Sequence, residues 1–145
     1  MTTEEARRLA EDVHVVALDR YGQPLLDHVR RVVELCPDDA RTVAWLHEIF
    51  ESSDLSADDL RRAGATDDEL RAVELLTRVP STDPADYEAH VQHIAQAPGR
   101  AGELARTVKR ADLRDRLDHR APDPPSAPAH PSYRRALTVL GAGSR

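Results

Sequence analysis

The chain has 145 residues, with 20 Lys or Arg against 26 Asp or Glu, so its net charge at pH 7 is −6. That length fits one domain, and the acidic balance argues against general nucleic-acid binding, which requires a concentrated basic face. Only 3% of the residues are aromatic, so Leu, Val and Ala must fill the core, which favours helices over a β-sandwich. A single cysteine, Cys36, excludes an internal disulfide, and no apolar run approaches the roughly 20 residues of a membrane span. Residues 1–5 lack the features of a secretory signal, so we expect a soluble, cytoplasmic protein.

Turn and capping signals divide the first half of the chain into five predicted helices. They cover residues 2–19, 24–36, 37–49, 56–64 and 66–79. Apolar residues recur at helical spacing in each segment, and in the first helix this pattern extends to Val16 and Ala17. Pro37 fits the first turn of the third helix, and Thr66 with Glu69 has the spacing of a capping box. The turn at Gly22 separates the first two helices.

The second half continues as helices and contains a proline-rich interruption. Helices are predicted over 83–96, 102–119 and 133–140. Residues 121–131 hold five of the ten prolines, and such a stretch forms an extended spacer rather than a helix. We therefore expect a helical domain over 1–120, a spacer over 121–131 and, within 132–145, a helix that docks back through Leu137 and Leu140. No strand pattern occurs, so the predicted fold class is all-α.

Five residues place imidazole or carboxylate groups on otherwise apolar helix faces. They are His28, His47, Glu48, Glu51 and Asp112. Burying such groups costs several kcal/mol unless each has a partner, and a divalent metal ion can satisfy several of them together. A plainer interpretation also exists for each one. A histidine near a core is usually just hydrogen-bonded, the glutamates could form a solvated helix edge, and Asp112 could pair with another side chain of its own helix.

Other metal patterns are incomplete. Residues 47–51 read H-E-I-F-E, which lacks the second histidine of an H-E-x-x-H zinc site. No Glu-x-x-His pair of the di-iron type occurs. His90 and His93 share a helix face without a suitably placed acid, so we interpret them as surface residues. Asp112 could instead form an ion pair within its own helix, with either Lys109 or Arg116.

Four segments of the chain resemble the motifs of one enzyme family. Residues 13–28 (V-H-V-V-A-L-D-R-Y-G-Q-P-L-L-D-H) are similar to A-H-x-G-Q-x-D-K-x-G-x-P-Y-x-x-H, and residues 44–52 (A-W-L-H-E-I-F-E-S) to A-x-L-H-D-x-x-E-D. Residues 73–78 (V-E-L-L-T-R) match V-x-x-L-T-R, and residues 108–116 (V-K-R-A-D-L-R-D-R) resemble V-K-x-A-D-x-x-x-N. These are motifs of small HD-domain phosphohydrolases, in particular the hydrolase domain of RelA/SpoT-type alarmone enzymes. The resemblance implies an HD-domain-like orthogonal bundle of six to eight helices.

The resemblance also implies a metal site and its chemistry. The ligands would be His28, His47, Glu48 and Asp112, and the ion would be divalent, with Mn²⁺ the expected metal. Glu51 takes the position of the acid that helps to generate the nucleophile. The substrate would be a small phosphorylated metabolite or nucleotide, such as a nucleotide pyrophosphate of the (p)ppGpp type.

Further positions correspond to segments that line the family's substrate pocket. Arg20 stands where the family has a basic residue near the substrate, and Lys109 neighbours the last metal ligand. Thr77 and Tyr87 fall in two other pocket-lining segments. These four residues are therefore the predicted substrate-binding residues.

The sequence departs from the family motifs close to the predicted metal site. Glu48 replaces the aspartate of the His-Asp pair, Ser52 replaces a second acid, and Arg116 replaces an asparagine and could pair with Asp112 in competition with a metal ion. The Gly-Gln of the opening motif is Val16-Ala17 here. Three hypotheses follow: a metal-dependent phosphohydrolase, a weakened or inactive protein of the same fold that binds a nucleotide or protein partner, and an unrelated helical interaction module. The sequence does not specify an oligomeric state.

Overall fold

The computed structural model describes residues 1–19, 21–79, 81, 83–119 and 130–143. The secondary structure of these residues is helical, apart from an isolated bridge between Leu18 and Pro24. The elements are α1 (Thr3–Val13), α2 (Leu25–Leu35), the 3-10 turn η1 (Asp38–Ala40), α3 (Arg41–Leu46), α4 (Ile49–Ser52), α5 (Ala57–Arg62), α6 (Asp67–Leu76), α7 (Pro84–Gln96), α8 (Gly99–Asp118) and α9 (His130–Gly143). The predicted all-α class is confirmed.

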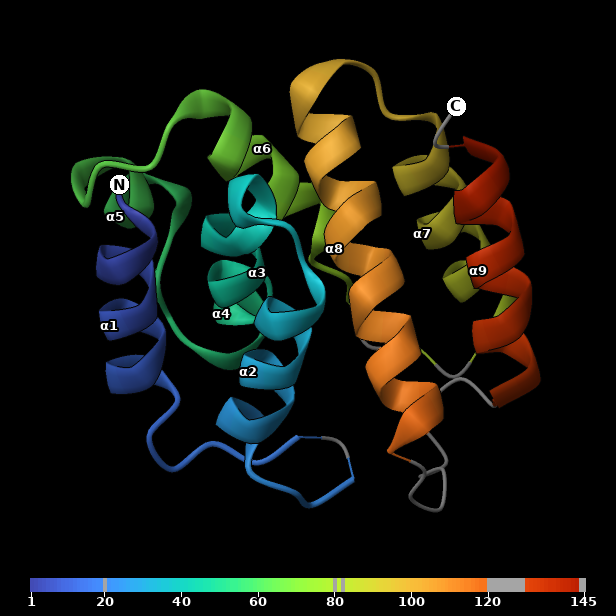
Figure 1. Ribbon diagram of the computed structural model, residues 1–145, viewed down its shortest axis with the longest axis horizontal. Helices are drawn as coiled ribbons and strands as arrows, with labels where there is room; N and C mark the ends of the chain where they lie inside the picture. The colour runs from blue at the N-terminus through green and yellow to red at the C-terminus, as the bar shows by residue number, and fades with distance from the viewer. Residues whose placement is uncertain (20, 80, 82, 120–129, 144–145) are drawn as a thin grey trace.

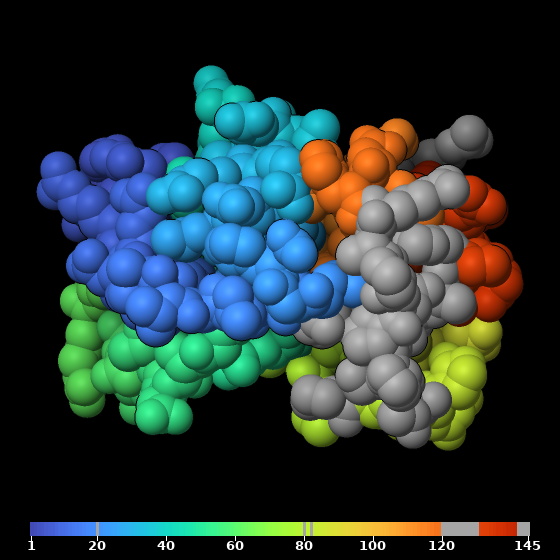
Figure 2. Space-filling model, turned by 90° about the horizontal axis from the view of Figure 1, so that it is seen from below, coloured from blue at the N-terminus to red at the C-terminus, as the bar shows by residue number. Residues whose placement is uncertain are grey.

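Helix α8 is the element that connects the two sides of the molecule. In Figure 1 it lies between α1–α6 on one side and α7 with α9 on the other. It packs against α2, α3 and α6 as well as against α7 and α9. Figure 2 shows the N-terminal segment (blue) and α9 (red) at opposite ends of the molecule, with α8 (orange) between them. A polar side chain on the inner face of α8 therefore lies at the centre of the bundle.

The helices begin where the sequence supplies side-chain caps. Thr66 accepts a hydrogen bond from the Glu69 amide, and the Glu69 carboxylate accepts one from the Thr66 amide, which completes the predicted capping box. Asp83 caps α7, and Pro84 occupies the first helical position, where its missing amide hydrogen costs nothing. These local signals explain why most predicted helix starts lie close to the observed ones.

The core is made almost entirely of aliphatic residues from facing helices. Its fully buried members include Val29 of α2, Leu46 of α3, Ile94 of α7 and Leu113 of α8. Trp45 is also buried. Burial of side chains of this size contributes roughly 1.5–3 kcal/mol each, so aliphatic packing is sufficient to hold the bundle without many aromatic residues.

The first helix is shorter than predicted. It ends at Val13 rather than near residue 19, and Val16 is 86% exposed. The Asp19 carboxylate accepts hydrogen bonds from the amides of Tyr21 and Gln23, and Gly22 takes a positive φ of 78°. The Asp19 amide also donates to the Gln23 carbonyl at 2.7 Å rather than to the carbonyl four residues earlier, so local turn chemistry outweighs the apolar periodicity here.

The C-terminal region has a helix that begins earlier than predicted. Helix α9 starts at His130 rather than near residue 133, and it packs on α7 and α8. Tyr133 and Leu140 are buried, whereas Leu137 is half-buried. Most of the predicted spacer, residues 121–129, lies outside the described residues, so the division into domain, spacer and docking helix stays a prediction. Within the described ranges, no helix has the length and apolar character needed to cross a bilayer.

Truncating one core leucine tests this assignment of the core. Leu46→Ala removes a fully buried side chain, so we expect the free energy of unfolding to fall by about 2–5 kcal/mol in urea denaturation. Leu35, which is 51% exposed, is the matched control, and Leu35→Ala should lower stability by about 1 kcal/mol or less. Equal losses in the two variants would contradict the assignment.

Candidate metal centre

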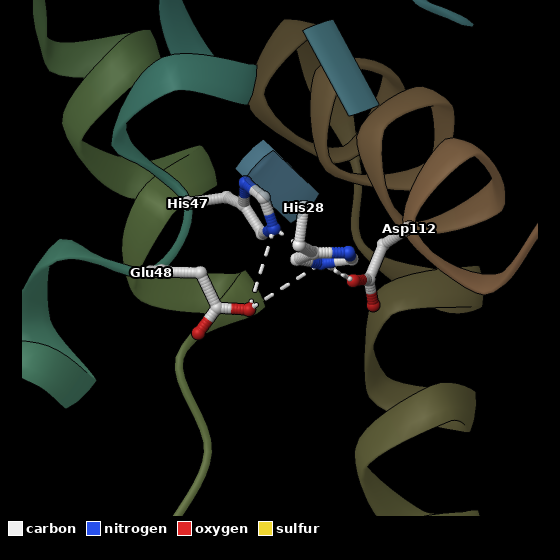
Figure 3. A group of neighbouring side chains, drawn as sticks. All are labelled: His28, His47, Glu48 and Asp112. Carbon is white, nitrogen blue, oxygen red and sulfur yellow. Dashed lines mark hydrogen bonds and ion pairs between the residues drawn. The ribbon is translucent and has the colours of Figure 1, made fainter. Parts of the chain in front are cut away.

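The four predicted metal ligands lie together in the centre of the bundle. His28 comes from α2, His47 and Glu48 from the junction between α3 and α4, and Asp112 from α8. All four are buried, and one potential ligand atom from each lies within 4.8 Å of the other three. Figure 3 shows the four side chains pointing toward one another from three separate parts of the chain. The tertiary structure therefore converts four dispersed residues into one site.

A break in the third predicted helix places two adjacent residues in the cluster. The sequence pattern predicts a continuous helix over 37–49, whereas the structure has η1, α3 and then α4, which begins after Glu48. Glu48 has φ −100° and ψ 0°, outside regular helical geometry. Consecutive side chains of a regular helix point about 100° apart. The break lets both His47 and Glu48 face the same centre.

His47 presents its Nε2 nitrogen to the centre of the cluster. Its Nδ1 donates a hydrogen bond to the Ala44 carbonyl at 2.6 Å, which fixes the ring orientation. Its Nε2 is buried, makes no hydrogen bond within the described chain, and lies 3.4 Å from Glu48 Oε1 and 3.7 Å from Asp112 Oδ1. Burial opposes protonation, but the Asp112 and Glu48 carboxylates raise the pKa of His47 to about 10. The two carboxylates thus favour a positive charge beside His47 Nε2, and a metal ion would provide that charge.

His28 is oriented by the carboxylate of Asp115, a residue that was not predicted from the sequence. Its Nδ1 donates to Asp115 Oδ2 at 2.6 Å, while its Nε2 lies 2.8 Å from Asp112 Oδ1. Asp115 in turn accepts hydrogen bonds from Arg31, at 2.6 Å from Nε, and pairs with His119 at 2.9 Å. A carboxylate behind a histidine is the usual way in which proteins fix the orientation of a metal-binding imidazole. The sequence contains one signal for this role: Asp115 follows Asp112 by three residues, so the two lie on the same face of the helix.

Two basic side chains of α8 surround Asp112. Lys109 Nζ lies 3.3 Å from Asp112 Oδ2, and Arg116 Nε lies 3.2 Å from Asp112 Oδ1, so both alternatives left open by the sequence occur together. Arg116 also donates to Glu48 Oε1 at 3.3 Å. Burial would raise the pKa of both carboxyl groups, but these cations and the neighbouring histidines hold the pKa of Asp112 and of Glu48 well below the usual values. Both acids are therefore ionised and able to bind a cation.

A narrow cleft with a volume of about 20 Å³ opens over the cluster. Besides three of the ligands, it is lined by Glu51, Leu76, Arg78, Tyr87, Lys109, Arg116 and Tyr133. The Glu51 carboxylate accepts a hydrogen bond from the Arg78 amide at 2.6 Å. Although part of Glu51 reaches the surface, removal of its carboxyl group from water and the nearby Glu48 charge raise its pKa to about 7. The predicted catalytic acid thus lies at the cleft beside the ligands.

The predicted substrate-binding residues fall in different places. Lys109 and Tyr87 line the cleft, with Lys109 Nζ 5.6 Å from the centre of the Tyr87 ring. Thr77 instead donates to the Val73 carbonyl at 2.8 Å and lines a neighbouring, more open pocket. Arg20 lies outside the described residues. The structure therefore places two of the four at the cleft.

Two further tyrosines near Tyr87, namely Tyr133 and Tyr21, were not predicted from the sequence. Tyr133 of α9 packs edge-on against Tyr87, with ring centres 6.1 Å apart, and its hydroxyl lies 2.6 Å from that of Tyr21. Arg116 lies 6.0 Å from the centre of the Tyr21 ring. These residues come from both ends of the chain, so sequence spacing gives no signal for their association.

The other histidine pair does not join the cluster. His93 is exposed as predicted, but His90 is half-buried, and its Nε2 makes no hydrogen bond with the described residues. Burial, helped by Lys109 and Arg78, lowers the pKa of His90 to about 3. Both histidines line the neighbouring open pocket. The surface interpretation was therefore wrong for His90, because α7 turns this residue toward the bundle.

Comparison with solved structures confirms the fold expected from the resemblance. A metazoan ortholog of SpoT, which hydrolyses ppGpp and plays a role in starvation responses, matches this chain with a TM-score of 0.71. The match covers 99% of this chain and 85% of that chain, at 16% sequence identity. No protein-family model and no curated protein matches the sequence. The chain thus shares the all-α fold of that ppGpp hydrolase, and the four buried residues His28, His47, Glu48 and Asp112 form a cluster that could hold a metal ion.

Substituting Asp115 tests its role behind His28. Asp115→Asn removes the negative charge shared by His28 and Arg31, so we expect Mn²⁺ affinity to fall about 10- to 100-fold. Breaking this buried pair should also lower the free energy of unfolding by about 3 kcal/mol. Isothermal titration calorimetry and urea denaturation measure the two effects. Asp118→Asn, an exposed change on the same helix, should alter neither, and an affinity unchanged in Asp115→Asn would refute the role.

Proposed function

We propose that the chain is a metal-dependent phosphohydrolase that acts on a small phosphorylated metabolite. The observation that carries this proposal is the buried set of two imidazoles and two ionised carboxylates, with the Nε2 of His47 lacking a hydrogen bond within the described chain. Four nitrogen and oxygen ligands of this kind suit Mn²⁺ or a similar divalent ion. His28, His47, Glu48 and Asp112 would hold it.

The residues around these ligands supply the other groups that phosphoryl transfer needs. A metal ion held by these four ligands would supply Lewis-acid chemistry, which polarises a phosphoryl oxygen and lowers the pKa of water. Glu51, beside Glu48 in the cleft, is placed to accept the proton of the attacking water and to orient that water. Lys109 and Arg78 line the same cleft and provide positive charge for phosphate oxygens.

A nucleotide pyrophosphate of the (p)ppGpp type is the substrate class we favour. The fold is shared with a ppGpp hydrolase, and the cleft combines cations with the ring of Tyr87, a surface on which a base or ribose can pack. We propose that Arg20 and Thr77 also bind the substrate, as the resemblance implies. The site of action would be the cytoplasm.

Removing one imidazole tests the metal site directly. His47→Ala deletes a central ligand, so the purified protein should lose its stoichiometric metal, measured by mass spectrometry after growth with Mn²⁺, and all phosphohydrolase activity. His93→Ala changes an exposed histidine and should affect neither property. Metal-dependent turnover that survives in His47→Ala would overturn the proposal.

Substituting Glu51 separates catalysis from metal binding. Glu51→Gln keeps the side-chain shape but cannot accept a proton, so we expect kcat to fall about 10²- to 10⁴-fold while metal content stays stoichiometric. Glu74→Gln, an exposed change on α6, serves as the control. Loss of the metal together with activity would instead identify Glu51 as a ligand.

A second candidate function is a catalytically inactive protein of the same fold that binds a nucleotide or a protein partner. The observation that favours it is the contact of Arg116 with both Glu48 and Asp112, because a guanidinium group supplies a cation where the metal would bind. The triple variant Glu48→Asp, Ser52→Asp and Arg116→Asn restores the family motif. Turnover in this variant but not in the wild type would establish the second candidate, and turnover in the wild type would exclude it.

A further inference from the structure

Arg116 is a buried cation in direct contact with the metal centre. It lies on α8 one turn after Asp112 and is 8% exposed. Its Nε donates to Asp112 Oδ1 at 3.2 Å, and its Nη2 donates to Glu48 Oε1 at 3.3 Å. A single planar guanidinium group therefore bridges the two acidic ligands, one from α8 and one from the junction between α3 and α4.

These two hydrogen bonds oppose metal binding. Asp112 Oδ1 already lies 2.8 Å from His28 Nε2 and 3.2 Å from Arg116, and Glu48 Oε1 lies 3.3 Å from Arg116. A metal ion needs lone pairs of these same oxygen atoms, and its charge repels the guanidinium group at this distance. Metal binding must therefore weaken or break the contacts of Arg116 with Glu48 and Asp112.

Arg116 also lines the cleft, where a displaced guanidinium group can contact a bound anion. Arg116 lines the same opening as Lys109 and Arg78, and it lies 6.0 Å from the centre of the Tyr21 ring. Glu51 is the other acid that lines this opening, and its carboxylate already accepts a hydrogen bond from the Arg78 amide. A buried arginine that has lost its carboxylates requires a new anion, because an unpaired charge in the interior is costly. The phosphoryl group of a substrate would provide it.

We infer that Arg116 couples metal binding to anion binding. In the metal-free site it neutralises Glu48 and Asp112, and on metal binding it transfers its hydrogen bonds to a phosphoryl oxygen of the substrate in the cleft. Metal ion and phosphorylated substrate then strengthen each other's binding, and Arg116 becomes a substrate-binding residue that the family motif, with asparagine at this position, does not have. This inference rests on the proposed function.

Mn²⁺ titration by isothermal calorimetry tests the competition. Because Glu48 and Asp112 are released from the guanidinium group, Arg116→Asn should bind Mn²⁺ about 10- to 100-fold more tightly than the wild type, a gain of about 1.4–2.8 kcal/mol. Arg116→Lys keeps the charge but cannot bridge both carboxylates, so its affinity should be intermediate. Arg114→Asn removes an exposed arginine from the same helix and should match the wild type. Circular dichroism and urea denaturation establish that each variant is folded.

A second titration tests the coupling itself. Sulfate serves as the probe, because it is a tetrahedral dianion that keeps Mn²⁺ in solution, with NaCl of equal ionic strength as the reference. In the wild type, sulfate should tighten Mn²⁺ binding about tenfold. In Arg116→Asn this enhancement should fall about threefold or more, since only direct contact of sulfate with the ion and the other cations remains.

The outcomes distinguish this inference from the proposed function. Metal binding that is equally tight in the wild type and in Arg116→Asn, or an unchanged sulfate effect, overturns the role of Arg116 and leaves the metal site intact. Absence of Mn²⁺ binding in both proteins overturns the metal site and the inference with it. Metal binding in Arg116→Asn alone supports the competition and favours the catalytically inactive candidate.

Discussion

The burial of two ionised carboxylates, Glu48 and Asp112, is the constraint on which the rest of the site depends. Neither acid can stay charged in the interior without cations or hydrogen-bond donors around it. The protein supplies His28, His47 and Arg116 within 4 Å of one or both acids. Such a concentration of charge is costly for stability, since well-packed apolar side chains of similar volume often do as well or better. The bundle nevertheless retains this concentration of charge at its centre.

Helix α8 carries most of this arrangement. Asp112 faces the centre, Asp115 supports His28 from behind, and Lys109 and Arg116 lie one turn to either side. Because these residues recur every three or four positions, one helix presents all four on adjoining faces. The same helix packs against both halves of the molecule, so the position of the charged groups is fixed by apolar packing along its whole length. The packing of α8 therefore contributes both to the stability of the bundle and to the geometry of the site.

Much of the fold was predictable, because helix caps, prolines and apolar periodicity act over a few residues. The capping box at Thr66 and the proline at the start of α7 marked helix starts correctly. Local signals failed where two of them competed. Val16 continues the apolar pattern of the first helix, but the helix ends at Val13 and the hydrogen bonds of Asp19 form a turn instead. The third predicted helix breaks at Glu48, and as a result two adjacent side chains face inward.

For the site, the sequence by itself determined which residue types were available. It also determined that imidazoles and carboxylates lay on apolar faces of three separate segments, and that Glu48, Ser52 and Arg116 departed from the family motif. Only the tertiary structure decided that Asp115 stands behind His28, that Arg116 bridges two ligands, and that Tyr133 contacts both Tyr21 and Tyr87. The physical reason is distance along the chain. Helix periodicity relates residues within a few turns, whereas these contacts join segments up to 112 positions apart, and they exist only once the helices have packed.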